Sequence, residues 1–215
     1  MQSFVCAVTS ANIGSPTLFR TYNVPRGESY NCKIWEAARA TSAAPTFFKP
    51  IKIGRENAEE IFIDAALGCN NPIRQVLGEV ELAFPGAPIA CVVSIGTGQR
   101  STIGLPKADA FQKWLPTKVI GVLQKLAVDS ETTAEDLQKR FENVPGVYFR
   151  LNVEHGMQGI TLEEWNKLGE VTTHTRKYLE KVKVSKEVDN IVKALIGESF
   201  SVPVSDLRMY CTRSY

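Results

Sequence analysis

The most informative segment of the chain is Phe62-Ile63-Asp64-Ala65-Ala66-Leu67-Gly68-Cys69-Asn70-Asn71-Pro72. Its first residues continue a short apolar run that begins at residue 60, and such a run predicts a β-strand with Asp64 at its C-terminal end. The C-terminal ends of strands are where α/β sheets place their binding and catalytic groups. The residues alone leave a second interpretation open, in which Asp64 is a turn residue that caps the backbone amides after it.

Segments typical of strands and of helices alternate on both sides of Asp64. Apolar, β-rich runs predict strands at 4–8, 16–22, 60–64, 89–95 and 147–153. Apolar spacing, alanine content and capping residues predict helices at 34–42, 72–77, 119–125, 130–141, 161–182 and 187–195. The run at 89–95 is continuously apolar, which is typical of a strand covered on both faces. We therefore expect an α/β fold with a helix-flanked, mainly parallel sheet.

The composition favours one globular domain and argues against several classes of function. The 215 residues are 44% hydrophobic and 22% charged, with a formal net charge of +2. That length is enough to bury a sizeable core, whereas the nearly neutral charge gives no reason to expect nucleic acid as a partner. The longest apolar runs are shorter than the roughly 20 residues that a membrane-spanning helix needs.

The cysteines and histidines argue against disulfides and bound metal. The five cysteines are scattered and include no C-x-x-C pair, which favours a reduced, cytoplasmic protein. Neither of the two histidines, His155 and His174, has a cysteine nearby that would complete a zinc site. We expect no metal and no cofactor.

Three blocks of the sequence, taken in order, resemble the patatin-like phospholipase family. They are residues 35–48 (WEAARATSAAPTFF), residues 62–72 and residues 92–98 (VVSIGTG). The second block is similar to the part of the family that carries the catalytic aspartate, and the other two resemble its flanking helix, turn and strand. The resemblance is strong over residues 4–98 and weaker to about residue 197. We therefore expect a partial patatin-like domain over 1–197, its C-terminal portion, and an irregular tail over 198–215.

The resemblance implies a function and a role for Asp64. Members of the family hydrolyse acyl esters of lipids with a serine–aspartate dyad, in which the serine lies in a Gly-x-Ser-x-Gly turn and backbone amides of a glycine-rich loop stabilise the oxyanion. Asp64 matches the dyad aspartate and would act as general base or orient the serine. A lipid or phospholipid acyl ester is the implied substrate. The implied location is cytoplasmic, with peripheral contact at a membrane surface as an alternative.

The chain departs from the family pattern in two ways. Ala65 stands where the family usually has glycine, and its methyl group restricts access to left-handed backbone angles. No Gly-x-Ser-x-Gly and no glycine-rich oxyanion motif occur in the 215 residues, the nearest approach being residues 197–201 (GESFS). In the family both missing elements lie N-terminal to the blocks seen here. We expect a fragment that is inactive by itself, because the nucleophile is indispensable to such a site.

Other candidate groups carry weaker signals. Ser94 ends a predicted strand beside Gly96 and Gly98, but a structural role is expected for it, and a strand terminator is the expected role of that glycine turn rather than an anion site. Trp35, Phe47 and Phe48 could line an acyl pocket, although core packing is the default expectation for such aromatics. Trp114 could touch lipid headgroups. Two alternative functions stay open: a non-catalytic lipid-binding or protein-interaction module built on the same scaffold, and a nucleotide or phosphate binder that uses residues 96–98.

Overall fold

A computed structural model describes residues 2–25, 30–45, 47–98, 130–157, 160, 164–198 and 202–203. These residues divide into two compact units. The first holds the described residues up to Ala83 together with residues 130–133, and the second holds the remainder. Each unit is therefore described by itself. The predicted catalytic residue Asp64 belongs to the first unit.

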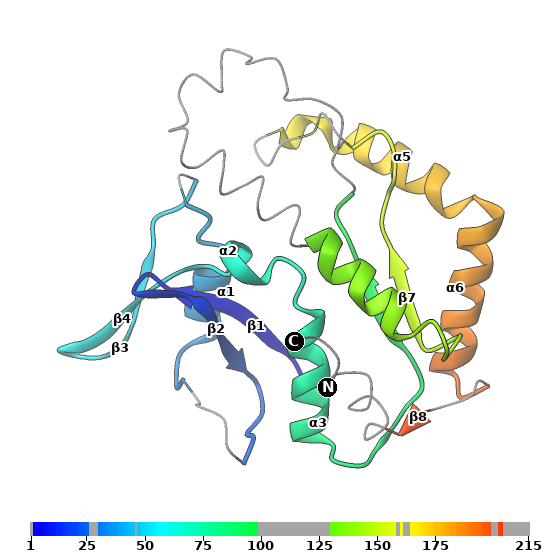
Figure 1. Ribbon diagram of the computed structural model, residues 1–215. Coiled ribbons are helices and arrows are strands. Elements are labelled where there is room, and N and C mark those ends of the chain that lie inside the picture. The colour runs from blue at the N-terminus through cyan, green and yellow to red at the C-terminus, as the bar shows by residue number, and fades with distance from the viewer. Residues whose placement is uncertain are drawn as a thin grey trace. The chain divides into compact units, whose positions relative to one another are not determined.

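The first unit is built on a four-stranded sheet in the order β2-β1-β4-β3 (Figure 1). The strands are β1 (Phe4–Thr9), β2 (Asn12–Arg20), β3 (Ile51–Arg55) and β4 (Ala58–Asp64), and every neighbouring pair is antiparallel. The expectation of a mainly parallel sheet is therefore wrong for the larger sheet. The chain is nevertheless a mixed α/β protein, as expected.

Short connections explain why these strands run antiparallel. Only Ser10 and Ala11 separate β1 from β2, and only Glu56 and Asn57 separate β3 from β4. A connection of two residues can join only antiparallel neighbours, because a parallel pair needs a crossover of a dozen or more residues. Asn57 adopts a positive φ of 64°, a left-handed conformation that asparagine tolerates in such tight turns. The sequence prediction missed β3 and with it this hairpin.

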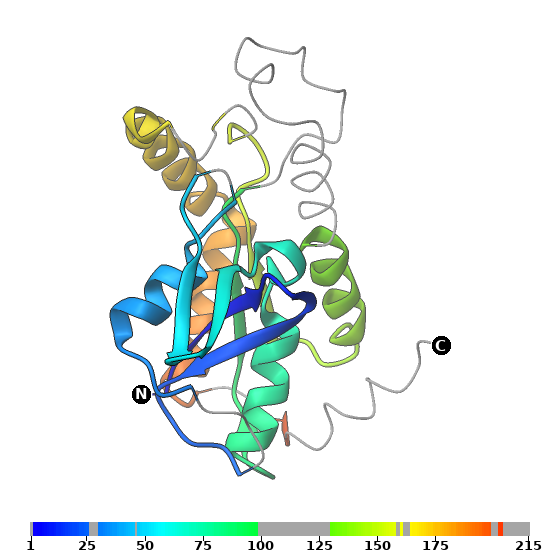
Figure 2. The same ribbon diagram turned by 90° about the vertical axis from the view of Figure 1, so that its left-hand side faces the viewer.

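Three helices accompany the sheet of the first unit: α1 (Ile34–Thr41), α2 (Ala66–Cys69) and α3 (Ile73–Ala83). Helix α1 packs against β1, β3 and β4, and Figure 2 shows it beside the β3–β4 hairpin. The carboxylate of Glu36 accepts the backbone N–H of Lys33 at 2.6 Å, which satisfies a donor at the start of α1. The short helix α2 packs on the other side, against β1 and β2.

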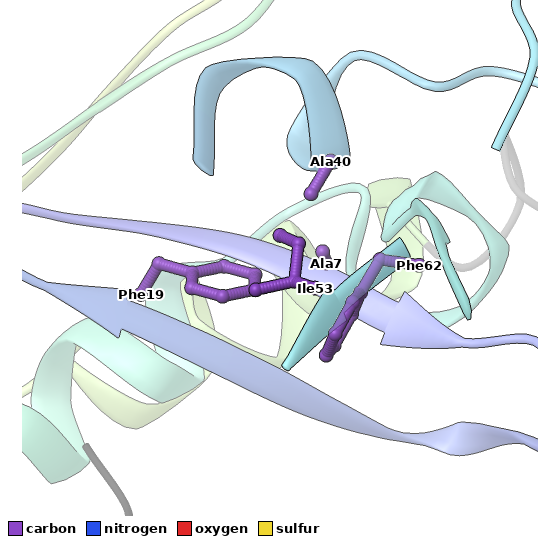
Figure 3. Close-up of a cluster of buried hydrophobic side chains, with 5 residues drawn as sticks. All are labelled: Ala7, Phe19, Ala40, Ile53 and Phe62. Atoms are coloured by element: carbon purple, nitrogen blue, oxygen red, sulfur yellow. The ribbon is translucent and has the colours of Figure 1, made fainter. Parts of the chain in front are cut away.

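The two faces of the sheet carry two separate apolar clusters. Between the sheet and α1 lie Ala7, Phe19, Ala40, Ile53 and Phe62 (Figure 3). Phe62 is fully buried, and its ring meets that of Phe19 edge to face at a centroid distance of 5.1 Å. On the opposite face lie Cys6, Val8, Ala65 and Cys69. Alternate residues of β1 thus serve alternate faces, as the pleat of a strand requires.

The second unit holds smaller sheets and helices, including most of the helical residues 130–140. Strand β6 (Val92–Ile95) pairs in parallel with β7 (Tyr148–Leu151), and β5 (Pro88–Ile89) pairs antiparallel with β8 (Val202–Pro203). The chain continues from a 3₁₀ turn at Trp165–Lys167 into α5 (Leu168–Leu179) and then α6 (Val182–Leu195). The parallel β6–β7 pair is the part of the structure that agrees with the expected parallel sheet.

Most predicted elements are present, with altered bounds. Residues 130–140 are helical, as expected. The predicted strand at 89–95 is interrupted at Ala90 and Cys91, and the helix expected to end near residue 182 ends at Leu179. The predicted helix at 119–125, the capping residue Thr161, Trp114 and residues 204–215 of the tail lie outside the described residues. Across the described part of the chain, no helix is long and apolar enough to cross a membrane.

Candidate functional site

Asp64 is the last residue of β4, an inner strand of the first unit's sheet. It lies opposite Ala7 of β1 in the antiparallel register. On the other side of β4, the pairing with β3 stops at Phe62, and the backbone N–H of Asp64 donates instead to the carbonyl oxygen of Ala43 at 3.1 Å. The end of the strand is therefore held from both sides, and this fixes the position from which the Asp64 side chain projects.

The carboxylate of Asp64 is half buried and only partly engaged. Its Oδ1 atom accepts the backbone N–H of Ala66 at 2.8 Å. Burial raises the pKa of Asp64 above its ordinary value, and the hydrogen bond from Ala66 opposes that rise. Within the described ranges, no ion pair of Asp64 is present. Because a carboxylate has about four acceptor positions, Asp64 retains the capacity to take a hydrogen bond or a proton from another group.

Ala65 fits the turn after Asp64 without backbone strain. Its φ and ψ angles are −69° and −6°, in the right-handed helical region that any L-residue adopts. Its methyl group is buried in the cluster with Cys6, Val8 and Cys69. The alanine that replaces the family's usual glycine therefore adds apolar contact and does not require a left-handed conformation.

The Asn70-Asn71-Pro72 turn is anchored by a buried side chain that the sequence did not single out for this role. The side chain of Asn71 accepts the backbone N–H of Ile73 at 3.4 Å and donates to the carbonyl oxygen of Ser130 at 3.3 Å. Asn71 is 8% exposed, so both bonds satisfy groups that water reaches poorly. The turn directs the chain from Asp64 into α3, which was predicted to reach residue 77 and extends to Ala83.

The block upstream of Asp64 contributes backbone rather than a nucleophile. Thr41 Oγ1 donates to the carbonyl oxygen of Cys6 at 2.6 Å, and Ser42 Oγ donates to that of Ala38 at 2.8 Å. The hydroxyl of Ser42 is thus bound to the last turn of α1. Trp35 and Phe48 are 59% and 58% exposed, so the expectation that they pack in the core is wrong. For Trp35 the reason is that the small residue Ala40 occupies the buried face of α1.

The glycine turn after β6 is held by bonds within the second unit. Ser94 is buried, and its Oγ accepts a hydrogen bond from Arg150 Nη1 at 2.8 Å. The N–H groups of Gly96 and Gly98 donate to Leu151 O and Asn152 Oδ1, each at 2.8 Å. Both glycine amides are therefore occupied by protein acceptors, which fits a strand terminator and disfavours an anion site there.

Among the described residues, Asp64 belongs neither to a metal-binding group nor to the lining of the surface pocket of the second unit. In the described portion of the chain, no group of three or more histidine, cysteine, aspartate or glutamate side chains could hold a metal ion. A surface pocket of about 310 Å³ is present in the second unit. Its lining residues are Gln138, Lys139, Phe141, Glu142, Val144, Pro145, Gly146 and Tyr148. None of these residues was predicted to carry chemistry, so Asp64 remains the candidate on which a site can be built.

Comparison with known proteins gives one family. Residues 6–77 match the model of the patatin-like phospholipase family. The chain is 30% identical over 174 residues to calcium-independent phospholipase A2-gamma of Oryctolagus cuniculus, a match that covers 76% of this chain and 21% of that protein. It is also 30% identical over 158 residues to the Homo sapiens protein of the same name, with 69% and 18% covered. Phospholipase A I of Arabidopsis thaliana is 30% identical over 146 residues, with 64% and 10% covered.

These comparisons bear on the site because the family match includes both Cys6 and Asp64. The chain spans about a fifth of the length of the first two of these relatives. The matches therefore concern a part of each relative and say nothing of what the rest of those proteins contributes.

Proposed function

Residues 6–77 of this chain belong to the patatin-like phospholipase family, and from this membership we propose that Asp64 is the carboxylate of a serine–aspartate lipid acyl hydrolase site. The matches to phospholipases support a lipid acyl hydrolase lineage. The proposal assigns the catalytic base to this chain and the serine to another polypeptide segment, because the 215 residues contain no Gly-x-Ser-x-Gly.

One observation supports Asp64 most directly: this half-buried carboxylate is fixed at the end of an inner strand and, among the described residues, accepts one hydrogen bond, at Oδ1. Burial raises its pKa, and a carboxylate with a raised pKa is a stronger base. In the proposed reaction the serine hydroxyl transfers its proton to Asp64 as the serine oxygen attacks the ester carbonyl. Asp64 passes this proton to the departing alcohol as the ester C–O bond breaks. Asp64 then takes a proton from the water that attacks the acyl-enzyme and returns it to the serine oxygen as the carboxylic acid leaves.

We propose a lipid or phospholipid acyl ester as the substrate and a cytoplasmic location with peripheral contact at a membrane surface. The names of the relatives support the substrate class. The exposed side chains of Ile34, Trp35 and Phe48 support the surface contact, because exposed aromatic residues favour the membrane interface. Arg39 lies beside them with its guanidinium 5.6 Å from the centre of the Phe48 ring, and a cation suits anionic headgroups.

A second candidate is a non-catalytic lipid-binding or protein-interaction module. The hydrogen bond from Ala66 favours it, since that contact explains Asp64 as a capping residue without any chemistry. The two candidate functions make different predictions once a catalytic serine is supplied. The hydrolase needs the charge of the Asp64 carboxylate for activity, whereas the module does not.

The deciding experiment is a chimera in which this chain replaces the matching stretch of a patatin-like domain that carries Gly-x-Ser-x-Gly. We expect the chimera to hydrolyse phosphatidylcholine in vesicles and Asp64→Asn to lower kcat by about 10⁴-fold. Asp189→Asn, which removes an equal charge from an exposed position on α6, is the matched control and should leave kcat unchanged. An active chimera that tolerates Asp64→Asn would exclude the catalytic role and favour the module.

The chain by itself provides a simpler test of where the nucleophile resides. A fluorophosphonate probe, which labels activated serines covalently, is expected to leave this chain unlabelled while labelling the active chimera. Labelling of any serine in the isolated chain would contradict the proposal that the nucleophile comes from another segment.

A further inference from the structure

Two cysteines from different elements meet beneath the turn that carries Asp64. Cys6 belongs to β1 and Cys69 is the last residue of α2. Each is 8% exposed, and both belong to the cluster that contains Val8 and Ala65. The two cysteines are more than 60 positions apart in the sequence and form no C-x-x-C motif, so the sequence alone does not predict that they lie together.

The fold of the first unit determines the meeting of the two thiols. Ala7 pairs with Asp64 across the sheet, so Cys6, its neighbour in β1, points to the opposite face. Helix α2 begins directly after Ala65 and packs against β1 on that face. The backbone N–H of Cys69 donates to the carbonyl oxygen of Ala65 at 2.7 Å, which closes the helical turn. The Cys69 side chain packs in the same cluster as Cys6 and Val8 of β1.

The two cysteines share one buried cluster and differ in acidity. The interaction with Cys6 lowers the pKa of Cys69, and the same interaction, together with burial, raises the pKa of Cys6. By contrast, burial raises the pKa of both Cys32 and Cys91. Because the thiolate is the reactive form, Cys69 is the cysteine of this group that is best prepared to react with an oxidant.

We propose that Cys6 and Cys69 are a redox-active dithiol that hydrogen peroxide converts to an intramolecular disulfide between β1 and α2. The Cys69 thiolate attacks one peroxide oxygen, the O–O bond breaks, and Cys69 sulfenic acid and hydroxide are formed. The Cys6 sulfur then attacks the Cys69 sulfur, the S–O bond breaks, and the Cys6 proton leaves with the hydroxyl group as water. Overall, two thiols are oxidised, one peroxide is reduced, and two waters are produced.

Peroxide suits this site because it is small and the pair is nearly buried. The disulfide would tie β1 covalently to α2, the helix that begins with the Ala66 N–H bound to Asp64. It would therefore restrain the backbone on both sides of the carboxylate, and it would raise the melting temperature of the first unit by restricting the unfolded chain.

The test uses the full chain with Cys32, Cys91 and Cys211 replaced by serine, so that Cys6 and Cys69 remain as the only thiols. After treatment of the folded protein with a stoichiometric amount of hydrogen peroxide, non-reducing peptide mapping is expected to find Cys6 joined to Cys69. Dithiothreitol should reverse the link. Two free thiols, or oxidation that stops at sulfinic acid, would overturn the proposal.

Two further arms show whether the native fold directs the reaction. In the chain with all five cysteines, Cys6–Cys69 should be the dominant link when the protein is folded, whereas oxidation in concentrated urea should distribute the links among the cysteines. The same distribution of disulfide links in folded and urea-unfolded protein would contradict the proposal that the native fold brings Cys6 and Cys69 together. In Cys6→Ser, dimedone should trap a sulfenic acid on Cys69, and the absence of that adduct would also contradict the proposal. No arm measures ester hydrolysis, so the outcome is independent of the proposed function.

Discussion

Oδ1 of Asp64 and the backbone N–H of Ala66 are 2.8 Å apart and form the hydrogen bond that begins α2. One oxygen of this side chain thus stabilises the turn, and the other has no hydrogen-bond partner among the described residues. Capping and catalysis are therefore compatible functions of one carboxylate. Substitutions that separate the acceptor from the charge can distinguish them.

We predict that Asp64→Ala destabilises the first unit by about 1 kcal/mol, because the Ala66 N–H loses its acceptor. Asp64→Asn keeps an acceptor oxygen and should cost less. Urea unfolding of the two variants and the parent chain measures both values. Equal destabilisation by the two substitutions would show that the charge, and not the hydrogen bond, stabilises the turn.

The free energy of unfolding should also depend on pH through Asp64. Burial raises the pKa of Asp64 in the folded state above its ordinary value of 3.8, so the folded protein binds this proton more tightly than the unfolded chain. Stability contributed by the protonated form is then lost as pH rises from 3.8 through the folded pKa. The Asp64→Asn variant has no titrating group at this position and does not lose this stability. The free energy of unfolding of the variant, relative to that of the parent, should therefore increase with pH across that window, and urea titrations measure it.

Arg20 and Glu79 form a nearly buried ion pair that ties β2 to α3. Arg20 donates from Nε and Nη2 to the Glu79 carboxylate at 2.5 and 2.7 Å, and the Tyr22 hydroxyl donates to Oε2 at 2.8 Å. We expect Glu79→Ala to destabilise the chain by about 3–5 kcal/mol, because it removes the carboxylate that compensates the nearly buried charge of Arg20. Chemical denaturation measures this. Glu59→Ala, which breaks the exposed Lys52–Glu59 pair, is the control and should cost about 1 kcal/mol or less.

The Glu79 pair also predicts acid sensitivity. The hydrogen bond from Arg20 holds the pKa of Glu79 below its ordinary value of 4.5. The stability that the carboxylate contributes is present above 4.5 and is lost as pH falls through the lowered pKa. Glu79→Gln should therefore flatten the acid limb of the stability curve. An acid limb of the same slope in parent and variant would contradict this assignment.

Two glycines in different settings should respond in opposite ways to alanine. Gly98 has a φ of +109°, and a Cβ atom there would lie 2.7 Å from the Cβ of Met157. Gly98→Ala should therefore destabilise the second unit by about 1–3 kcal/mol. Gly78 lies within α3, and a Cβ there meets nothing within 4 Å, so Gly78→Ala should stabilise by about 0.4–1 kcal/mol. Thermal unfolding of both variants tests these two predictions. A change of melting temperature with the same sign in both variants would contradict them.

Phe62 is expected to be the most sensitive core position of the first unit. Its side chain is fully buried between the Phe19 and Tyr30 rings, with centroid distances of 5.1 and 5.5 Å. Phe62→Ala should cost about 3–5 kcal/mol, because a large cavity replaces the ring. Ile61→Ala changes the neighbouring, 40% exposed residue and should cost much less. Comparable losses at the two positions would mean that β4 presents its other face to the core.

Sequence reasoning was most successful where the signal is local. The apolar runs located β1 and β4, the alanine-rich segment located α1, and the ordered blocks led to the family that the comparisons confirm. It was least successful with β3, a five-residue strand whose residues alternate weakly. It also placed Trp35 and Phe48 in the core, because hydrophobicity alone does not say which side of an element faces inward.

The order of residues along the chain was sufficient to single out Asp64 at a strand end, because burial patterns and turn chemistry are properties of neighbouring residues. The order of residues did not predict which strands pair with the strand that ends at Asp64. The antiparallel pairing with β1, the contact of Asp64 with Ala43, the bond of Arg20 to Glu79 and the meeting of Cys6 with Cys69 join distant positions. Such contacts depend on which connections close and which faces pack, and these are settled by the free energy of the whole folded unit rather than by any local segment.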